Sequence, residues 1–313
     1  MILLNTLYVI CYIVRNINSP VKRQGLPMKN TNQAIFYAVL AAALYALNAP
    51  VSKLLLNHIP STMMAGLLYL GAGMGMYLME KFRRNHEEQP LTRQELPYTV
   101  AMVVLDIAAP IFLMIGLTRC SAANASLLNN FEIVATSLIA LFLFKEAVSR
   151  RLWIAIALVT LSSILLSVED LSSFTFSIGS IFVLLACVCW GFENNCTRML
   201  SSKNPAQIVV IKGFGSGIGA LALALIVGER YFHIWHMALA LLLGFVSYGI
   251  SIYFYIYAQR DLGAAKTSTY YAVSPFIGAA LSLLIFREIP SAVFLLALII
   301  MAAGTYLASV EAD

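Results

Sequence analysis

The stretch from Ser121 to Glu146, SAANASLLNNFEIVATSLIALFLFKE, constrains this chain more than any other. It is long enough to cross the hydrocarbon core of a bilayer as a helix, yet Asn129, Asn130 and Glu132 lie near its middle. Its pattern returns 142 positions later in Gly263 to Glu288, GAAKTSTYYAVSPFIGAALSLLIFRE. A membrane helix with polar groups at its centre, used twice, predicts a duplicated membrane protein with an internal site.

Composition identifies the solvent around most of this chain. Of its 313 residues, 60% are hydrophobic and 11% are charged, whereas soluble domains carry about 25% charged residues. So many apolar side chains require lipid, in which backbone groups must bond within helices or closed barrels. The apolar runs are continuous over about 20 residues, which favours helices over the alternating strands of a barrel. We therefore predict an all-α integral membrane protein.

The apolar runs after Met28 predict ten transmembrane helices with short loops and no separate soluble domain. We expect the helices at residues 34–56, 60–81, 97–118, 121–143, 150–168, 174–200, 205–227, 237–259, 263–286 and 290–309. Residues 1–33 are a predicted N-terminal extension, whose apolar segment from Ile2 to Val14 is too short to span a bilayer. Residues 1–27 are interpreted either as an extension upstream of a true initiator at Met28 or as an interfacial helix.

Basic residues predict the orientation, because cytoplasmic loops carry an excess of Lys and Arg. With the N-terminus in the cytoplasm, fifteen of the twenty Lys and Arg residues fall on the inner side and four on the outer side, which leaves Lys212 inside a span. We therefore expect both termini in the cytoplasm and the protein in a bacterial cytoplasmic (inner) membrane.

The repeat extends beyond one helix and divides the chain into two predicted halves, 34–168 and 174–309. Each half holds five predicted spans, and an odd number forces the second half to insert upside down. Inverted repeats are a recurring plan of secondary transporters, whose binding site lies at the midplane between the halves. At a shift of 142, Ala122, Ala123, Ser126, Leu141, Phe144 and Glu146 match Ala264, Ala265, Ser268, Leu283, Phe286 and Glu288.

The repeated unit resembles the ten-helix EamA-type carriers of the drug/metabolite transporter superfamily, over about residues 34–309. It consists of a small-residue helix start, an apolar helix, Phe-x-Glu and another apolar helix. The resemblance implies a ten-helix inverted-repeat fold, a central cavity, and movement of small metabolites or drugs, often outward. The motif occurs as Ala122–Ala123 with Phe144–Lys145–Glu146, and again as Ala264–Ala265 with Phe286–Arg287–Glu288.

Three polar residues in the first copy are the leading candidates for substrate binding. Glu132 lies mid-span, where a carboxylate is costly and usually faces the bundle interior or a wet cavity. Asn129 precedes it by about one helical turn, and Asn130 extends the polar stripe. Glu132 would bind a cationic or amino group of the cargo or exchange a proton with it. A protonated glutamate bonded to a neighbouring helix is the structural alternative.

Three charged residues in other spans are further candidates. Asp106 precedes Pro110 by four residues, and proline lacks the amide that would bond the Asp106 carbonyl. This opened backbone suits a proton or a polar substrate; alternatively, Asp106 pairs with a base such as Lys212. Lys212 would neutralise Glu193 or Glu132, bind an anionic group, or extend to the cytoplasmic interface. Glu193 would line a cavity mouth, or belong to a wet helix end.

Four neutral residues complete the predicted site. Asn48 is the repeat partner of Glu193, and Tyr248 is the partner of Asp106. Tyr270 and Tyr271 lie in the second copy, where Tyr271 corresponds to Asn129. Because symmetry-related positions differ in polarity, the pocket would suit an asymmetric small molecule. Tyrosines also anchor helices at membrane interfaces, which is the alternative interpretation.

Glycines recur in two spans that correspond between the halves. Glycine spacing of this kind lets helices approach closely. Close packing is the simpler interpretation, and sliding of the two helices during transport is the alternative. The glycines are Gly71, Gly73 and Gly75 in the second span and Gly215, Gly217 and Gly219 in the seventh.

No pattern predicts a cofactor, a metal or a nucleic acid partner. A phosphate-binding Gly-Lys-Ser/Thr loop is missing, so we expect no direct use of ATP. His58, His86, His233 and His236 are all expected in loops without a further ligand, which argues against a metal site.

These observations predict a secondary active transporter and not an enzyme. It would export a small metabolite, such as an amino acid or a drug-like compound, by alternating access around a central cavity. Glu132 and Asp106 are the candidates for proton coupling, the partners are the substrate and membrane lipid, and the protein would be a monomer or a homodimer. The alternatives are a membrane enzyme acting on a lipid-linked substrate, or a nucleotide-sugar or nucleobase carrier of the same superfamily.

Overall fold

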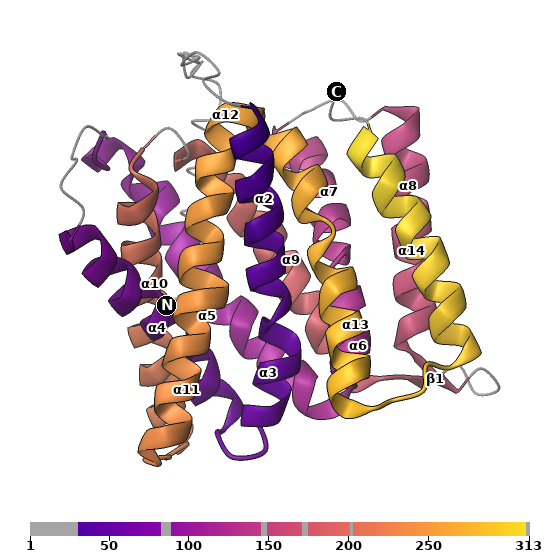
Figure 1. Cartoon of the computed structure of the whole chain (residues 1–313), viewed down its shortest axis with the longest axis horizontal. Coiled ribbons are helices and arrows are strands. Elements are labelled where there is room, and N and C mark those ends of the chain that lie inside the picture. The colour runs from indigo at the N-terminus through magenta and orange to yellow at the C-terminus, as the bar shows by residue number, and fades with distance from the viewer. Residues whose placement is uncertain (1–30, 83–88, 145–148, 171–174, 201–202, 311–313) are drawn as a thin grey trace.

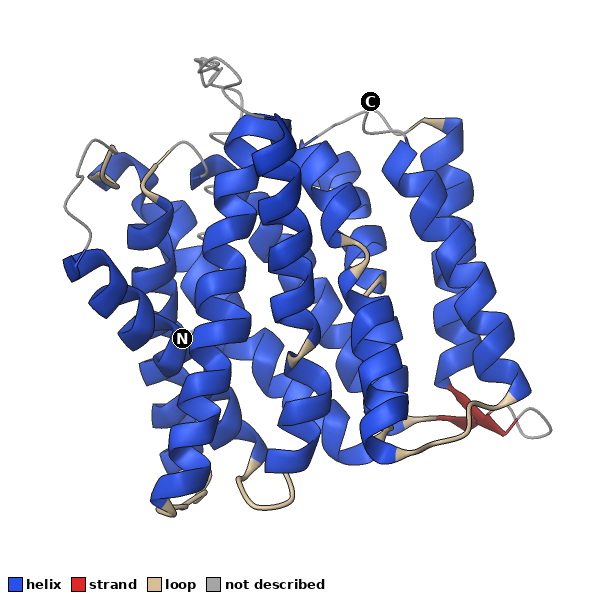
Figure 2. Ribbon diagram, viewed as in Figure 1, coloured by secondary structure: helices blue, strands red, loops and turns tan. Residues whose placement is uncertain are grey.

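The computed structural model describes residues 31–82, 89–144, 149–170, 175–200 and 203–310. The predicted extension up to Asn30 and the motif residues Lys145 and Glu146 lie outside them, as does His86. Within the described residues the chain is a bundle of upright helices, drawn in blue in Figure 2. The predicted all-α membrane fold is therefore confirmed.

The first half supplies five crossings, two of which are divided into paired helices. The first crossing consists of α2 and α3, and the fourth consists of α6 and α7. The elements are α2 (Thr31–Ala46), α3 (Asn48–Leu55), α4 (Ser61–Phe82), the 3₁₀ turn η1 (Arg93–Glu95), α5 (Leu96–Arg119), α6 (Ala122–Leu128), α7 (Phe131–Phe144) and α8 (Arg150–Ser167).

A short antiparallel ribbon leads into the second half. Its strands are β1 (Val168–Asp170) and β2 (Thr175–Phe176), with Val168 opposite Phe176. The ribbon is a small addition to the predicted helical fold, between the fifth and sixth crossings. The helices that follow are α9 (Ile178–Leu200), α10 (Pro205–Ile226), α11 (Ile234–Gly244), the π-helix η2 (Phe245–Ile250), α12 (Ser251–Tyr271), α13 (Ser274–Phe286) and α14 (Ala292–Val310).

The described helices account for the ten predicted crossings. Eight helical segments are long and apolar enough to cross a membrane, and the two shorter apolar helices are Ser274–Phe286 and Ala292–Ala308. The loop expected between residues 259 and 263 is replaced by helix. The chain stays helical through the residues after Gln259, and Figure 1 shows it turning back at the upper end of α12.

The two halves run in opposite directions. Figure 1 shows the first half beginning at the upper edge with α2 and the second half beginning at the lower edge, beside β1. Corresponding helices pack against one another, α4 on α10, α8 on α14 and α6 on α13. Other contacts between the halves also correspond. The third crossing, α5, packs on the sixth, α9, and likewise α12 of the eighth crossing packs on α2 of the first. The arrangement is that of an inverted repeat.

Glycines bring α4 and α10 together at their crossing. A Cβ added to Gly213 would come 2.3 Å from the amide nitrogen of Gly73, and one added to Gly217 would come 2.6 Å from that of Leu70. Real side chains cannot approach a backbone so closely, so only glycine permits this packing. The close packing predicted from the repeated glycines is present, and sliding of the helices stays a prediction.

Three of the crossings are interrupted near their middle, which the sequence analysis did not predict. The breaks lie at Leu47 between α2 and α3, at 129–130 between α6 and α7, and at 272–273 between α12 and α13. Pro50 and Pro275 each remove an amide that the preceding turn would use. At the second break, Asn130 donates its backbone N–H to Leu127 and Glu132 donates to Asn129, three residues back instead of four.

Candidate functional site

A cluster of charged side chains lies buried between α5, α9 and α10. Nζ of Lys212 is 3.0 Å from Oδ2 of Asp106 and 2.9 Å from Oε1 of Glu193. The three side chains expose 6%, 0% and 3% of their surface, respectively. Tyr69 donates its hydroxyl hydrogen to Oδ1 of Asp106 over 2.8 Å, and the Thr197 hydroxyl donates to Oε1 of Glu193. The ammonium group thus joins an acid of the first half to an acid of the second.

Local sequence positions these groups. Thr197 follows Glu193 by four residues on α9, so its hydroxyl lies beside the carboxylate one turn away. Gly213 follows Lys212, and a Cβ added to it would come 2.8 Å from the backbone oxygen of Tyr69. This close approach of α10 to α4 brings Lys212 within reach of the acid that Tyr69 contacts. The small residue beside the lysine is therefore part of how the cluster is built.

The cluster is formally negative when its groups are ionised, because two carboxylates share one ammonium group. A third acid, Glu132 on α7, accepts a hydrogen bond of 2.5 Å from Nδ2 of Asn194 on α9 and is partly exposed. Ionised groups removed from water are costly unless they are paired and hydrogen-bonded.

The alternative in which Lys212 extends to the interface is wrong, because its side chain is 6% exposed and contacts two acids.

A network of neutral polar groups adjoins the charged cluster. Asn48 on α3 donates from Nδ2 to the Tyr248 hydroxyl over 3.0 Å and accepts from the Ser52 hydroxyl over 3.1 Å. The ring of Tyr248 lies 4.9 Å from that of Tyr69, measured between centroids. Tyr248 belongs to η2, and short π-helical turns often occur at functional sites. The tyrosine pair links the network to Asp106.

The three helix interruptions surround a small polar cavity of about 10 Å³. Tyr45 and Asn48 reach it from either side of the first break, Asn129 from the second and Ser274 from the third. The full lining is Tyr45, Ala46, Asn48, Ala49, Ser126, Asn129, Ser274, Pro275 and Gly278. The cavity therefore lies where both halves contribute broken helices.

The structure gathers most of the predicted site residues into these two neighbouring groups. Tyr271 joins them through its ring, which lies 5.9 Å from that of Tyr45 and 4.9 Å from that of Tyr255, between centroids. Asn130 is 2% exposed at the second break, and its side-chain amide has no hydrogen-bond partner among the described residues. Tyr270 is partly buried at the end of α12 and does not line the cavity.

Sequence reasoning missed several residues of the site. Tyr69 and Tyr45 contact the predicted residues directly, and Thr197 and Ser52 complete their hydrogen bonds. One signal was available, because Tyr69 and Tyr45 lie in the middle of predicted spans and not at their interfaces, where tyrosine is common.

Comparison with known proteins agrees with this architecture. The family model of EamA-like transporters matches residues 32–168 and 177–310. The chain belongs to the EamA-like transporter family. It is 23% identical over 289 residues to an uncharacterized transporter of Methanothermobacter thermautotrophicus, covering 86% of this chain and 84% of that one. The fold also matches a solved crystal structure with a TM-score of 0.62 at 16% identity, over 90% of this chain and 97% of the other. The protein is therefore a multi-pass membrane transporter.

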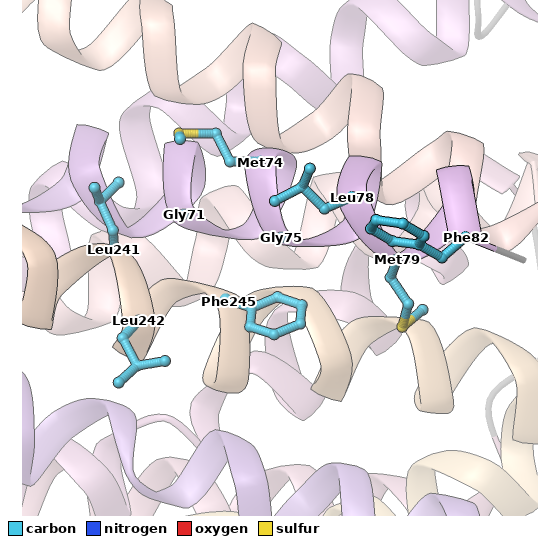
Figure 3. Close-up of a pocket in the computed structure, with 9 residues that line it drawn as sticks. All are labelled: Gly71, Met74, Gly75, Leu78, Met79, Phe82, Leu241, Leu242 and Phe245. Carbon is cyan, nitrogen blue, oxygen red and sulfur yellow. The ribbon is translucent and has the colours of Figure 1, made fainter.

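An apolar groove of this EamA-like protein lies away from the polar groups. It holds about 370 Å³ and runs between α4 and the α11–η2 segment, as Figure 3 shows. Its lining is apolar, and Leu78, Phe82 and Leu242 expose more than half of their surface. Such a surface suits lipid acyl chains and offers no polar group to a small metabolite. The lining residues are Gly71, Met74, Gly75, Leu78, Met79, Phe82, Leu241, Leu242 and Phe245.

The histidines do not form a metal site within the described residues, where no group of three or more potential ligands is arranged to hold an ion. The ring of His236 instead stacks on those of His58 and His233, with centroids 4.3 Å and 4.5 Å apart. We predicted His236 in a loop, but it lies in the first turn of α11. That helix begins earlier than expected because the backbone oxygen of His233 accepts from Met237.

Proposed function

We propose that this EamA-like protein is a secondary transporter that exports a small metabolite with a cationic or amino group by alternating access. The two bodies that rock against each other are residues 34–168 and 174–309. The observation that carries the proposal is the ion cluster between them, in which Lys212 of the second half pairs with Asp106 of the first. A purely structural core would not need ionised groups at such a position.

The excess of carboxylates over bases supports a cationic group in the cargo. Asp106, Glu193 and Glu132 are three acids, and Lys212 is the one base that the described contacts place among them. An amino group or a proton arriving at this cluster would relieve the excess negative charge. The apolar helix surfaces elsewhere in the bundle offer no polar group that could distinguish one solute from another. We therefore assign substrate recognition to this charged cluster.

The same cluster provides a way to couple binding to rocking. When Lys212 contacts both acids, it holds α10 to α5 and thereby one half to the other. A cation that binds Glu132 or Asp106 would weaken the hold of Lys212 on the first half and allow the alternative packing. Because the α4–α10 contact is formed by glycine, its helices could slide without side-chain clashes. Proton coupling through Glu132 and Asp106 is part of this proposal.

The orientation follows from the basic loops, with both termini in the cytoplasm of a bacterial cell. The protein would work as a monomer or a homodimer, without a cofactor and without catalysing a chemical reaction. In this orientation, export means that the cargo enters the binding site from the cytoplasmic side, which carries most of the Lys and Arg residues.

Counterflow in proteoliposomes tests the proposal. Vesicles loaded with amino acids, amines or drug-like cations would be tested for uptake of the same labelled solute, with and without a pH gradient. We expect exchange of at least one amino-containing solute, reduced at least tenfold in Asp106→Asn and Glu132→Gln. Glu288→Gln removes the same charge at an exposed position and is the matched control. Full flux in both site variants would overturn the assigned roles.

A further inference from the structure

The small cavity at the three helix breaks contains oxygens that the protein leaves without partners. Ser126 is 2% exposed and Ser274 is 1% exposed, and both line the cavity. Neither hydroxyl oxygen has a hydrogen-bond partner among the described residues. Buried polar side chains almost always have a partner, and an exception is explained by strain, a catalytic role, or a bound water or ion.

Most other buried serines of this chain have a partner among the described residues, and Ser180 is a further exception. The hydroxyls of Ser163 and Ser282 each donate to the backbone oxygen four residues earlier, over 2.8 Å and 2.7 Å. Ser126 and Ser274 do not make this local bond, although both lie in helices. Ser274 begins α13 after a break of two residues that follows the end of α12. Both hydroxyl oxygens therefore lie at the cavity without a partner among the described residues.

The backbone contributes a third oxygen. Pro50 has no amide hydrogen, so it cannot bond the carbonyl of Ala46, which is the last residue of α2. A Cβ added to Gly278 would come 3.2 Å from the Ala46 oxygen and 3.0 Å from the Ser126 oxygen. The absence of a side chain at Gly278 therefore keeps open a space that two oxygens of different helices share.

The atoms that line the cavity indicate which kind of ligand it could bind. Hydroxyl and carbonyl oxygens are the donors that hard cations prefer, and divalent ions usually require carboxylates as well. None of the lining residues is acidic. A space of about 10 Å³ corresponds to one water-sized body, which excludes an organic cation. Interrupted helices with freed carbonyls are a known means by which membrane transporters hold monovalent ions.

The surrounding charges favour a cation as well. Asn48 lines the cavity, and its side chain donates to the Tyr248 hydroxyl and accepts from the Ser52 hydroxyl. The Tyr248 ring packs on Tyr69, whose hydroxyl bonds Asp106 of the negative cluster.

We propose that this cavity binds one monovalent alkali cation, Na⁺, through Ser126, Ser274 and the Ala46 carbonyl. The bound ion joins three broken helices from both halves, so its occupancy stabilises one packing of the halves. Its role as a coupling ion rests on the proposed transport function, whereas its binding does not.

Thermal unfolding of the full-length protein in detergent tests binding without transport. The protein is prepared in choline chloride, and NaCl or KCl replaces it at constant ionic strength. We expect Na⁺ to raise the unfolding midpoint in a saturable way, because a ligand that binds only the folded state stabilises it. K⁺ should act at least tenfold more weakly. Equal midpoints in all three salts would overturn the proposal, since the cavity then holds only water.

Variants locate the site. Ser126→Ala and Ser274→Ala each remove one oxygen and should raise the Na⁺ concentration for half-maximal stabilisation at least tenfold. Gly278→Ala places a methyl group in the shared space and should abolish the Na⁺ response. Ser282→Ala on α13 is the matched control, because its hydroxyl bonds Gly278, and it should respond as the unchanged protein does. An undiminished Na⁺ response in Ser126→Ala and Ser274→Ala would overturn the assignment.

The two proposals fail in distinguishable ways. A Na⁺-specific rise of the midpoint without counterflow of any solute would leave the ion site standing and remove the transport assignment. Counterflow that is independent of Na⁺, together with midpoints that ignore Na⁺, would leave transport standing and remove the ion site.

Discussion

Two polar regions lie close together in this protein, and they are completed in different ways. In the charged cluster, Lys212 contacts Asp106 and Glu193, and Tyr69 supplies a further hydrogen bond. At the helix breaks, the hydroxyls of Ser126 and Ser274 are equally buried and have no partner among the described residues. The first region is satisfied by the protein itself, whereas we propose that the second is satisfied by a bound cation. Disturbing them should therefore affect stability very differently.

The largest expected effect is that of removing the central base. Lys212→Met should lower the free energy of unfolding by about 3–5 kcal/mol, because it leaves two carboxylates buried without a counter-charge. Unfolding in mixed micelles with increasing SDS, followed by circular dichroism, measures the change.

Lys203→Met is the matched control for this prediction, since Lys203 is 3.3 Å from Glu95 in a more exposed ion pair. Such pairs contribute about 0–1 kcal/mol. If the two substitutions cost the same, the cluster is not held by its charges and the comparison between the two polar regions fails.

A smaller effect should separate the charged cluster from the neutral network beside it. Tyr69→Phe removes a hydrogen bond to a carboxylate and should cost about 1.5–3 kcal/mol, whereas Tyr248→Phe removes a bond from an amide and should cost about 0.5–1.5 kcal/mol. Both tyrosines are 1% exposed, so the variants are matched in burial. The reverse order in the same SDS titration would mean that Asp106 does not depend on Tyr69.

The smallest effect is expected at the helix breaks. In a buffer without alkali cations, Ser126→Ala should change the free energy of unfolding by less than about 0.5 kcal/mol, because no protein hydrogen bond is lost. Ser162→Ala is the control, since it removes a bond of 2.6 Å to the backbone oxygen of Ala297 and should cost about 1 kcal/mol. A large loss in Ser126→Ala under these conditions would show that its hydroxyl does have a protein partner.

The candidate site could be predicted in part because ionisable residues are rare inside apolar runs. Asp106, Glu132, Glu193 and Lys212 could be chosen on that ground alone. Their partners could not be chosen, because a pairing such as that of Asp106 with Lys212 joins residues of different halves. Asp106 and Lys212 were proposed as one alternative among several, and only the packing of α5 against α10 brings them within 3.0 Å.

The helix breaks, by contrast, could not be predicted from the sequence. Pro50 and Pro275 are visible in the sequence, yet proline bends one transmembrane helix and divides another, depending on its neighbours. Asn129 and Asn130 were selected for their polarity, and nothing local indicated that the chain would leave its helix there. The continuous helix of α12 was missed for the reverse reason, since its polar residues suggested a loop.

The sequence by itself determined a ten-helix, duplicated membrane protein, because apolar length, loop charge and a repeat at constant spacing are all properties of the linear chain. Only the tertiary structure decided which polar groups meet, and which of them have a partner among the described residues. The physical reason is that hydrogen bonds and ion pairs in a bilayer depend on distances between helices, and those distances are set by the packing of small residues such as Gly213 and Gly278 across the two halves.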